Sequence, residues 1–373
     1  MLNVKECLKK YAYRNIPLEF EEAYELGLFA LKGYNGDELT RIQSITLMSA
    51  LHNQAIYSNG AAGQIAGICA AIFEHDIAKS EFGFFNPDVD YAMDNSGMGG
   101  DLVVTANAST ISAFIAATAG IPMCKHGSPA NADEGRHGSS DFIELCGINV
   151  LPSREKAKQS LEELNFVYIE ALDVRYKRIH LQTHEIAQLP HMNDIIGPIT
   201  NPLNPKLLTR RVLGVNHLIS PRTVAEAYHV LNQKGITCLD HGLFIRGFVD
   251  EQKESGIDEI SICRGGTQVA ELKEGHIKEY MLYAEDFGID PIDQRFISPP
   301  PGVSKGDFSL SIIDRTIATK FAQQMVAANA VPLLYLAERS QNWKECYKTA
   351  ESILLSGEAY NRMLTVKEML PKK

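Results

Sequence analysis

The sequence has no long hydrophobic run, because no window of its 373 residues approaches 18 uncharged apolar residues. A transmembrane helix needs about that length. The opening residues MLNVKECLKK also lack the apolar stretch of a secretory signal. We therefore expect a cytoplasmic protein that makes no use of a membrane.

Cysteine pairs and excess positive charge are also missing. The seven cysteines include no CxxC pair, which argues against both a disulfide framework and a zinc ribbon. The 36 Lys and Arg residues are outnumbered by 46 Asp and Glu residues, which leaves a net charge of −10. Proteins that follow nucleic-acid phosphates normally carry a basic stripe instead. We therefore expect no nucleic-acid partner.

The first part of the chain has a helical pattern. Residues 18–29 and 42–53 place apolar side chains three to four positions apart, which is the period of an amphipathic helix. The segment 172–202 again looks polar and helical before GPITNPLNP interrupts it. We interpret this segment as a return of the chain to the helical part.

After Phe82 the pattern changes to short apolar runs, each followed by a polar or glycine-rich loop and then a helix. Such runs occupy residues 91–93, 123–124, 165–169, 212–215 and 236–243. This alternation is typical of a parallel sheet with crossover helices. We predict an α/β protein in which a small, discontinuous helical domain accompanies a larger α/β domain with a mainly parallel sheet. The predicted boundaries are 1–85 with about 172–202, and about 86–171 with about 203–373.

The most informative segment reads NSGMGGDLVVTANAST, from Asn95 to Thr110. It follows an apolar run and precedes a helix that we predict from about 109 to 119. A strand, a glycine turn and a helix start together bring backbone N–H groups toward an anion. The segment is neither a P-loop, which needs GK[ST], nor the dinucleotide fingerprint, which needs another glycine. A tight turn without a ligand would also explain the glycines, so both interpretations stay open.

Three further features strengthen the ligand interpretation. Lys125 ends the next apolar run, and it should therefore lie at the same carboxyl edge of the sheet as a counter-charge for phosphate. The polar loop 128–140 suits a lid over this edge or a plain surface loop. The adjacent carboxylates Asp258 and Glu259 suit either a solvated turn or oxygen ligands for Mg²⁺ beside phosphates.

These motifs, taken in order, resemble the anthranilate phosphoribosyltransferase family. They are GMGGD, NAST, KHG, GSSD, GPITNP, HG, GIDEIS and ELKEGHIKEYMLYAEDFGI, and the resemblance extends to ANAVPLLYLA at 328–337. It implies a phosphoribosyltransferase fold of the nucleoside phosphorylase type, homodimeric through its helical domain. It also implies that phosphoribosyl pyrophosphate and Mg²⁺ are held between the domains, with anthranilate as the leading acceptor in tryptophan biosynthesis.

The resemblance also implies roles for individual residues. It assigns catalytic roles to Asp101 and Lys125, and metal binding to Ser109, Asp258 and Glu259. The expected donor-binding residues come from the glycine loop, the helix start and the lid: Gly97, Gly99, Gly100, Asp101, Asn107, Ser109, Thr110, Lys125, Gly138 and Ser139.

The acceptor side departs from the family pattern. Ser128 stands where the family has an asparagine after KHG, and His184 lies in the region of an arginine that recognises the acceptor's carboxylate. A histidine is a poor replacement for a bidentate guanidinium. The residues expected to contact the acceptor are His126, Ser128, His184, Gly197 and Pro198. The cations close enough in sequence to replace the arginine are Arg175, Lys177, Arg178, Arg210 and Arg211.

Three alternatives therefore stay open. The same donor with a different acceptor would explain the altered acceptor residues. A pyrimidine nucleoside phosphorylase shares the architecture, but its loop typically reads KHS, and it has no use for Asp258 and Glu259. A non-catalytic relative that binds nucleic acid would need a basic surface, which a net charge of −10 does not suggest.

Overall fold

Eight strands form one sheet, and the first five run parallel to one another in the order β3-β2-β1-β4-β5. The computed structural model describes residues 6, 9, 16–33, 36–57, 60–101, 103–130, 138–181, 189, 191–316 and 320–372. The strands are β1 Met93–Gly97, β2 Met123–Gly127, β3 Phe166–Glu170, β4 Arg210–Gly214, β5 His241–Phe248, β6 Gly256–Ile257, β7 Gly266–Lys273 and β8 His276–Leu282. The predicted α/β architecture with a mostly parallel sheet is confirmed.

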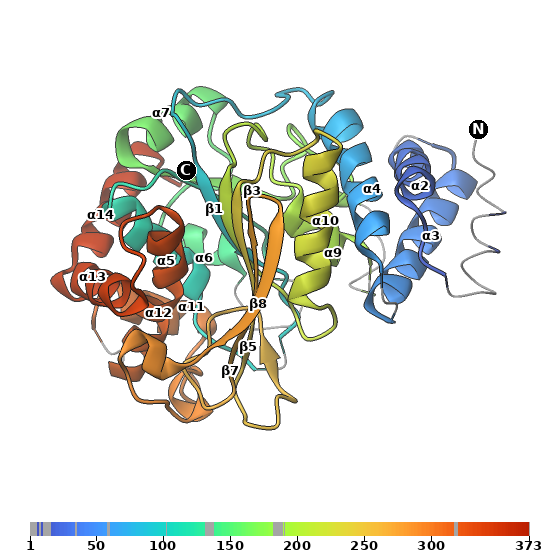
Figure 1. The fold of residues 1–373 in the computed structure, drawn as a ribbon. Coiled ribbons are helices and arrows are strands. Elements are labelled where there is room, and N and C mark those ends of the chain that lie inside the picture. The colour runs from blue at the N-terminus through green and yellow to red at the C-terminus, as the bar shows by residue number, and fades with distance from the viewer. Residues whose placement is uncertain are drawn as a thin grey trace.

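Helices cover both faces of this sheet (Figure 1). α5 Ala108–Thr118, α12 Lys320–Leu336, α13 Trp343–Ser356 and α14 Glu358–Met369 lie on one side. α10 Pro221–Gln233 and α9 Asn193–Ile199 lie on the other. α6 Ser139–Leu145, α7 Arg154–Leu164 and α11 Lys305–Ile313 complete the α/β part, together with the 3₁₀ turns Ala284–Phe287 and Gln294–Phe296.

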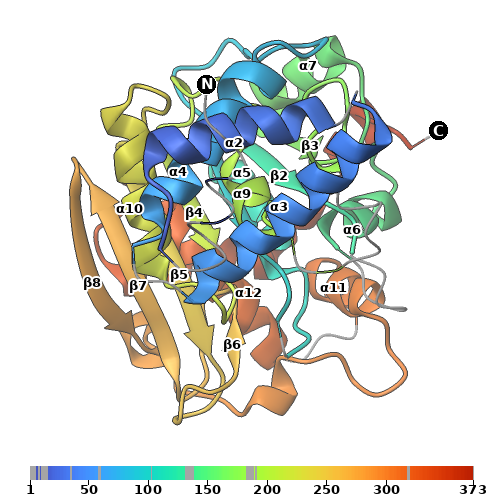
Figure 2. The same cartoon turned by 90° about the vertical axis from the view of Figure 1, so that its right-hand side faces the viewer.

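The N-terminal helices lie at one end of the molecule. They are α2 Phe20–Gly33, α3 Glu38–Tyr57 and α4 Ala62–Ile72, and α4 continues into a π-helical turn, Phe73–Ile77. α2 and α3 form the layer nearest the viewer in Figure 2. A bond from the Met192 amide to the Met48 carbonyl, 3.1 Å, ties the residues before α9 to α3. No helix within the described ranges is long and apolar enough to cross a membrane.

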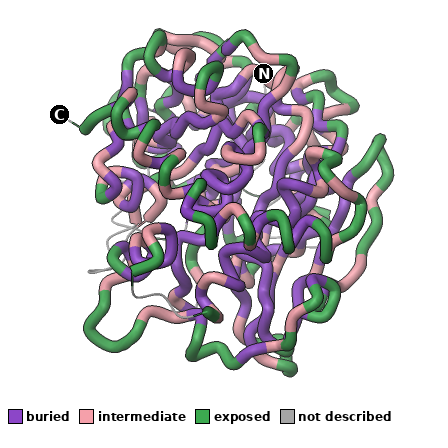
Figure 3. The backbone as a smooth tube through the Cα atoms, turned by 90° about the vertical axis from the view of Figure 1, so that its left-hand side faces the viewer, coloured by how far each residue is buried: buried purple, intermediate pink, exposed green. Residues whose placement is uncertain are grey.

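The core follows the alternation of side chains along the strands. Val212 and Leu243 join a hydrophobic cluster with α5 and α12, whereas Leu213 and Phe244 join a second cluster that extends through α10 to α4 and α2. Neighbouring residues of a strand point to opposite faces, so β4 and β5 each serve both clusters. Buried residues accordingly run through the interior in Figure 3, while exposed ones gather in the loops.

Three expectations about elements are wrong. β1 does not stop before the glycine segment but includes Asn95 and Ser96. β5 begins only at His241 because the Asn232 side chain accepts bonds from the Thr237 hydroxyl and the Leu239 amide, which keeps 236–240 as a loop. The described residues 171–180 form turns instead of a helix. Asp173 accepts bonds from both the backbone and the side chain of Arg175, and such local bonds compete with helix formation.

Candidate active site

Three of the parallel strands end in a glycine at the same edge of the sheet. Gly97 ends β1 and pairs with Gly214 at the end of β4, while Gly127 ends the neighbouring β2. A Cβ atom at Gly97 or Gly214 would collide with Asp258, and one at Gly127 would collide with the Ser139 hydroxyl. The strand ends must therefore be bare for other segments to approach them. This repeated glycine is a signal that the sequence analysis overlooked.

The glycine loop and the acidic pair meet at this edge. The Gly99 amide donates to a carboxylate oxygen of Asp258 over 2.7 Å, and the Asp258 amide donates to the Asp101 carboxylate over 3.0 Å. Gly99 and Gly100 both have positive φ, 71° and 78°, which favours glycine. Burial, followed by the nearby Asp258 charge, raises the pKa of Asp101 well above its usual value.

Glu259 is buried beside this pair. It accepts a 2.8 Å bond from the Thr105 hydroxyl, and burial, followed by the Asp258 charge, raises its pKa to about 7. Asn329 on α12 holds the next residue in place, because its side chain bonds both the amide and the carbonyl of Ile260. The sequence analysis missed Asn329, although it lies within the ANAVPLLYLA motif.

Lys125 lies beneath the glycine loop and is 1% exposed. Its ammonium donates to the Asn95 carbonyl over 2.7 Å. Burial lowers its pKa to about 8, whereas the charges of Asp94, Asp258 and Glu259 act in the opposite direction. Lys125 thus adds positive charge under the carboxylate cluster. It lies in β2 two residues before Gly127, near the carboxyl edge of the sheet where its position in the sequence led us to expect it, but it is buried.

The start of α5 is held by a distant hydroxyl. Ser309 on α11 accepts bonds from the Asn107 amide, 2.8 Å, and from its side chain, 3.1 Å. Ser109 is partly exposed, and its carbonyl accepts a bond from Asn95. Thr110 is fully buried, and its hydroxyl has no hydrogen-bond partner among the described residues. Ser309 is a second residue that sequence reasoning missed.

Both ends of the predicted lid are fixed to each other. The Gly138 amide donates to Asp141, and the Ser139 hydroxyl bonds both the Ser128 carbonyl, 3.3 Å, and the Tyr168 hydroxyl, 2.9 Å. A Cβ at Gly138 would collide with the backbone of 128–130. Residues 131–137 of the predicted lid lie outside the described residues.

Four of the five residues expected to contact the acceptor lie within the described part of the chain. His126 is 1% exposed, and burial, followed by the charge of Lys177, lowers its pKa well below the usual value. Its Nε2 has no hydrogen-bond partner among the described side chains. The His180 ring packs so close to Gly197 that a Cβ atom there would collide with it. Pro198 is the next residue of α9, and Ser128 is exposed. His184 lies outside the described residues.

Most of the cations that might replace the arginine are engaged elsewhere. Arg175 bonds Asp173, and Arg210 bonds Glu338 at the start of β4, away from the glycine loop. Arg211 is fully buried against Asp94, and Lys177 donates to backbone carbonyls of 197 and 200. These four side chains are therefore already paired within the fold.

The carboxylates Asp101, Asp258 and Glu259 fit a Mg²⁺ ion that is shared with a phosphorylated ligand. Within the described ranges no group of three His, Cys, Asp or Glu side chains forms a metal site by itself. Mg²⁺ needs no such cage, because it usually takes one or two protein carboxylates and fills its other positions with phosphate oxygens and water. Burial, followed by repulsion from Asp258, raises the pKa values of Asp101 and Glu259, and a cation beside them would act against both causes.

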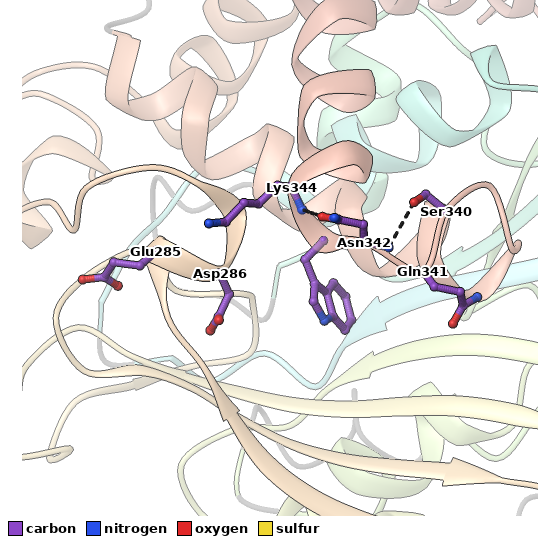
Figure 4. A pocket seen from close by; sticks show the side chains of 7 residues that line it. Glu285, Asp286, Ser340, Gln341, Asn342 and Lys344 are labelled. Atoms are coloured by element: carbon purple, nitrogen blue, oxygen red, sulfur yellow. Dashed lines mark hydrogen bonds between the residues drawn. The ribbon is translucent and has the colours of Figure 1, made fainter.

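A surface pocket of about 660 Å³ lies elsewhere on the molecule (Figure 4). Its lining includes Trp343, whose ring stacks on Tyr335 with the centroids 4.3 Å apart. The Tyr335 hydroxyl bonds Glu271, which also bonds His241, the first residue of β5. The pocket is therefore at the amino edge of the parallel strands, opposite to the glycine loop.

The buried residue His191, just before α9, should make the stability of the protein depend on pH. Burial, followed by the charge of His52, lowers the pKa of His191 to about 4, whereas a histidine in the unfolded chain titrates near 6.5. Between these values the unfolded state holds a proton that the folded state lacks. Acidification through this window therefore costs about 3 kcal/mol of stability through this group.

His191→Gln keeps an acceptor for the Asn193 amide, which bonds His191 Nδ1. The free energy of unfolding of this variant should rise relative to that of wild type as the pH falls from 7 to 4.5. Urea unfolding at pH 7 and at pH 4.5 measures the difference. The control is His276→Gln, because His276 is exposed. Equal pH dependence of wild type and His191→Gln would contradict the prediction.

Comparison with known proteins gives this site a class. Residues 90–360 match the family model described as the glycosyl transferase family, a/b domain. The chain is 33% identical to an anthranilate phosphoribosyltransferase of Psychromonas ingrahamii over 76% of this chain and 78% of the relative. It is 31% identical to that of Pyrobaculum islandicum over 73% and 76%. The chain belongs to the anthranilate phosphoribosyltransferase family.

Solved structures agree with the fold. The crystal structure of anthranilate phosphoribosyltransferase from Thermus thermophilus has a TM-score of 0.73 at 24% identity and covers 96% of this chain and 98% of that one. The Saccharomyces cerevisiae enzyme in complex with PRPP and Mg has a TM-score of 0.75 at 18% identity, with 98% of each chain covered. At these identities the likeness establishes the architecture.

Proposed function

We propose that this protein transfers the phosphoribosyl group of phosphoribosyl pyrophosphate to anthranilate, a step of tryptophan biosynthesis. The observation that carries the proposal is the hydrogen-bonded contact of Gly99 with Asp258, and of Asp258 with Asp101. It joins the glycine loop, in which Gly100 is exposed, to a carboxylate cluster, and such a pair suits a pyrophosphate with Mg²⁺.

The glycine loop and the start of α5 bind the donor in this proposal. Gly99 and Gly100 are exposed, and the Gly99 amide already bonds Asp258. α5 begins directly behind the loop with its positive dipole end. Gly97, Asn107, Ser109 and Thr110 complete this wall, and Gly138 and Ser139 close it from the lid. Lys125 acts through its charge from below. Asp101 is assigned to a water of the metal, and Asp258 and Glu259 with Ser109 to the metal itself.

The chemistry demands little beyond these groups. An amine nitrogen attacks C1 of the ribose while the bond to pyrophosphate breaks, and the amine then loses a proton. Bound Mg²⁺ supplies charge stabilisation of the leaving pyrophosphate. The loop N–H groups and Lys125 stabilise the same developing negative charge. No strong base is required, because the amine proton becomes acidic only after attack.

The acceptor is assigned to the opposite wall, which includes His126, Ser128, Gly197 and Pro198. His184, which lies outside the described residues, stays a candidate from the sequence. The neutral state of His126, which its lowered pKa favours, suits contact with the uncharged amino group of an aromatic amine. We further propose that residues 1–85 with 172–202 act as the acceptor-side domain, that this domain forms a homodimer, and that the protein works in the cytoplasm.

The second candidate keeps the donor and changes the acceptor. Ser128 in place of asparagine favours it, as does the engagement of Arg175, Lys177, Arg210 and Arg211 within the fold. This candidate predicts donor binding without consumption of anthranilate.

One experiment separates these candidates. The protein is incubated with donor, Mg²⁺ and anthranilate, and the loss of anthranilate fluorescence is followed. Calorimetry with donor and Mg²⁺ is run alongside. Fluorescence loss supports anthranilate. Donor binding without fluorescence loss supports another acceptor, and the absence of both signals contradicts the proposal.

A further inference from the structure

Two fully buried cations meet the last carbonyl groups of α9. Lys177 Nζ donates to the carbonyls of Gly197, 3.4 Å, and Thr200, 2.8 Å, and to the Thr200 hydroxyl, 3.0 Å. The Arg211 guanidinium donates to the carbonyls of Pro198, 2.8 Å, and Ile199, 3.2 Å. All four consecutive carbonyls from 197 to 200 therefore accept a hydrogen bond from a cation.

This arrangement answers a specific need of a short helix. The last four carbonyls of any helix lack partners within the helix, and cations are favoured there by the helix dipole. α9 has seven residues with Pro198 inside it, and so short a helix has little stability of its own. Its carboxyl end depends on Lys177 and Arg211.

Each cation connects this helix end to a different part of the protein. Arg211 pairs with Asp94 over 2.7 Å and also bonds Ser96, both on β1, which leads directly into the glycine loop. Lys177 lies in the field of Asp76 from the π-helical turn after α4. The Asp76 carboxylate also fixes the chain after Lys177, because it accepts the amides of Arg178 and Ile179, both over 2.8 Å.

We propose that Lys177 and Arg211 are positioning residues for the acceptor. They set the distance from the end of β1 to the part of α9 that contains Gly197 and Pro198. This inference rests on the proposed function, which assigns the acceptor to that wall. The three ammonium N–H groups of Lys177 and the terminal N–H groups of Arg211 all have acceptors in the fold. The two cations therefore shape the acceptor wall without reading the acceptor's own charge.

The direct test is Lys177→Met, which keeps an unbranched side chain one atom shorter and removes the three donors. A wall displaced by about 1 Å is expected to raise the KM for anthranilate tenfold or more, while the KM for the donor stays within twofold. Tyr228→Phe is the milder variant, because the Tyr228 hydroxyl contacts Arg211 and donates to the Ile199 carbonyl over 3.0 Å. It should raise the acceptor KM in the same direction by a smaller factor. The matched control is Lys156→Met, because Lys156 is exposed on α7.

A second measurement reads the helix end without any substrate. The Thr200 amide bonds the Ile196 carbonyl over 3.0 Å, and its hydrogen exchange should quicken at least tenfold in Lys177→Met and less in Tyr228→Phe. Faster exchange with a selective rise in acceptor KM supports the proposal. Unchanged exchange, or equal rises of both KM values, overturns it. If the wild-type protein does not consume anthranilate but the Thr200 amide exchanges slowly, the proposed acceptor alone is contradicted. The comparison of Thr200 exchange between wild type and variants then decides the positioning role.

If Lys177→Met fails to fold, as urea unfolding would show, Tyr228→Phe carries both measurements. The same two outcomes then apply: a selective change in acceptor KM and Thr200 exchange supports the inference, and no change in either overturns it.

Discussion

Asp258→Asn is expected to lower kcat/KM for the donor by about 10²- to 10³-fold, the usual effect of removing one electrostatic contact in a reaction of this kind. The amide has the same shape as the carboxylate, and its oxygen can still accept the Gly99 amide, which bonds Asp258 over 2.7 Å. The variant therefore preserves the loop and removes one negative charge beside Glu259.

The loss of the Asp258 charge should already weaken donor binding, which can be measured without turnover. Calorimetry with donor and Mg²⁺ is expected to give a strongly weakened signal for Asp258→Asn, because a hard cation binds a neutral amide oxygen less well than a carboxylate. Initial rates at varied donor concentration then give kcat/KM. Thr105→Val, which removes the hydroxyl that bonds Glu259 over 2.8 Å, should weaken donor binding by a smaller factor.

Asp250→Asn is the matched control. Asp250 also accepts two backbone amides, those of Glu254 and Ser255, in the turn between β5 and β6. It lies eight positions before Asp258 and makes the same kind of contact without facing the glycine loop. Its kcat/KM should stay within twofold of wild type. Wild-type donor affinity in Asp258→Asn would remove the basis for a pyrophosphate and Mg²⁺ site here.

The sequence predicts the donor half of this site because each of its parts has a local pattern. Glycine or polar residues follow apolar runs at the glycine segment and at Lys125, and parallel strands bring such groups to one edge. Contacts across the chain leave no such pattern. Gly99 and Asp258 are 159 positions apart, and Asn107 and Ser309 are 202 apart.

Burial is the second property that the sequence did not reveal. Lys125 was expected at the carboxyl edge of the sheet, and packing places it near that edge but only 1% exposed, with its ammonium on the Asn95 carbonyl. The fate of a long side chain depends on the elements packed around it, so its position in the sequence indicates the neighbourhood and not the exposure.

The hairpin of β7 and β8 was overlooked although it has a signal. Glu274 and Gly275 both have positive φ, 48° and 80°, as a two-residue turn of type I′ requires. The flanking TQVAELK and HIKEYML alternate less clearly than an edge pair usually does. The turn dipeptide was therefore the better guide than the hydrophobic pattern.

The acceptor half could not be predicted because the described residues 171–180 of its segment form turns. The turns of 171–180 depend on Asp173 and on Asp76, which is 102 positions before Arg178. The cations of this region looked available for a ligand. Their use inside the fold follows only from the position of α9 relative to β1.

Arg211→Met is expected to lower the free energy of unfolding by about 3–5 kcal/mol, because it removes one partner of a buried ion pair and leaves the other charge uncompensated. Arg211 and Asp94 are both 0% exposed, and they meet over 2.7 Å. In the variant, the remaining bond to the Asp94 side chain comes from the His126 amide, 3.0 Å. The carbonyls of Pro198 and Ile199 lose donors as well.

Urea unfolding of three variants separates the lost charge pair from the lost packing. Arg210→Met, one residue earlier, removes a partly exposed cation whose partner Glu338 is 61% exposed, and it should cost no more than about 1 kcal/mol. Asp94→Asn combined with Arg211→Met removes both charges and should recover part of the loss, since no buried carboxylate then lacks its partner. If the single variant Arg211→Met is as stable as Arg210→Met, the Asp94 carboxylate must be paired with water or another cation. The ion pair would then contribute little to the junction between β1 and α9.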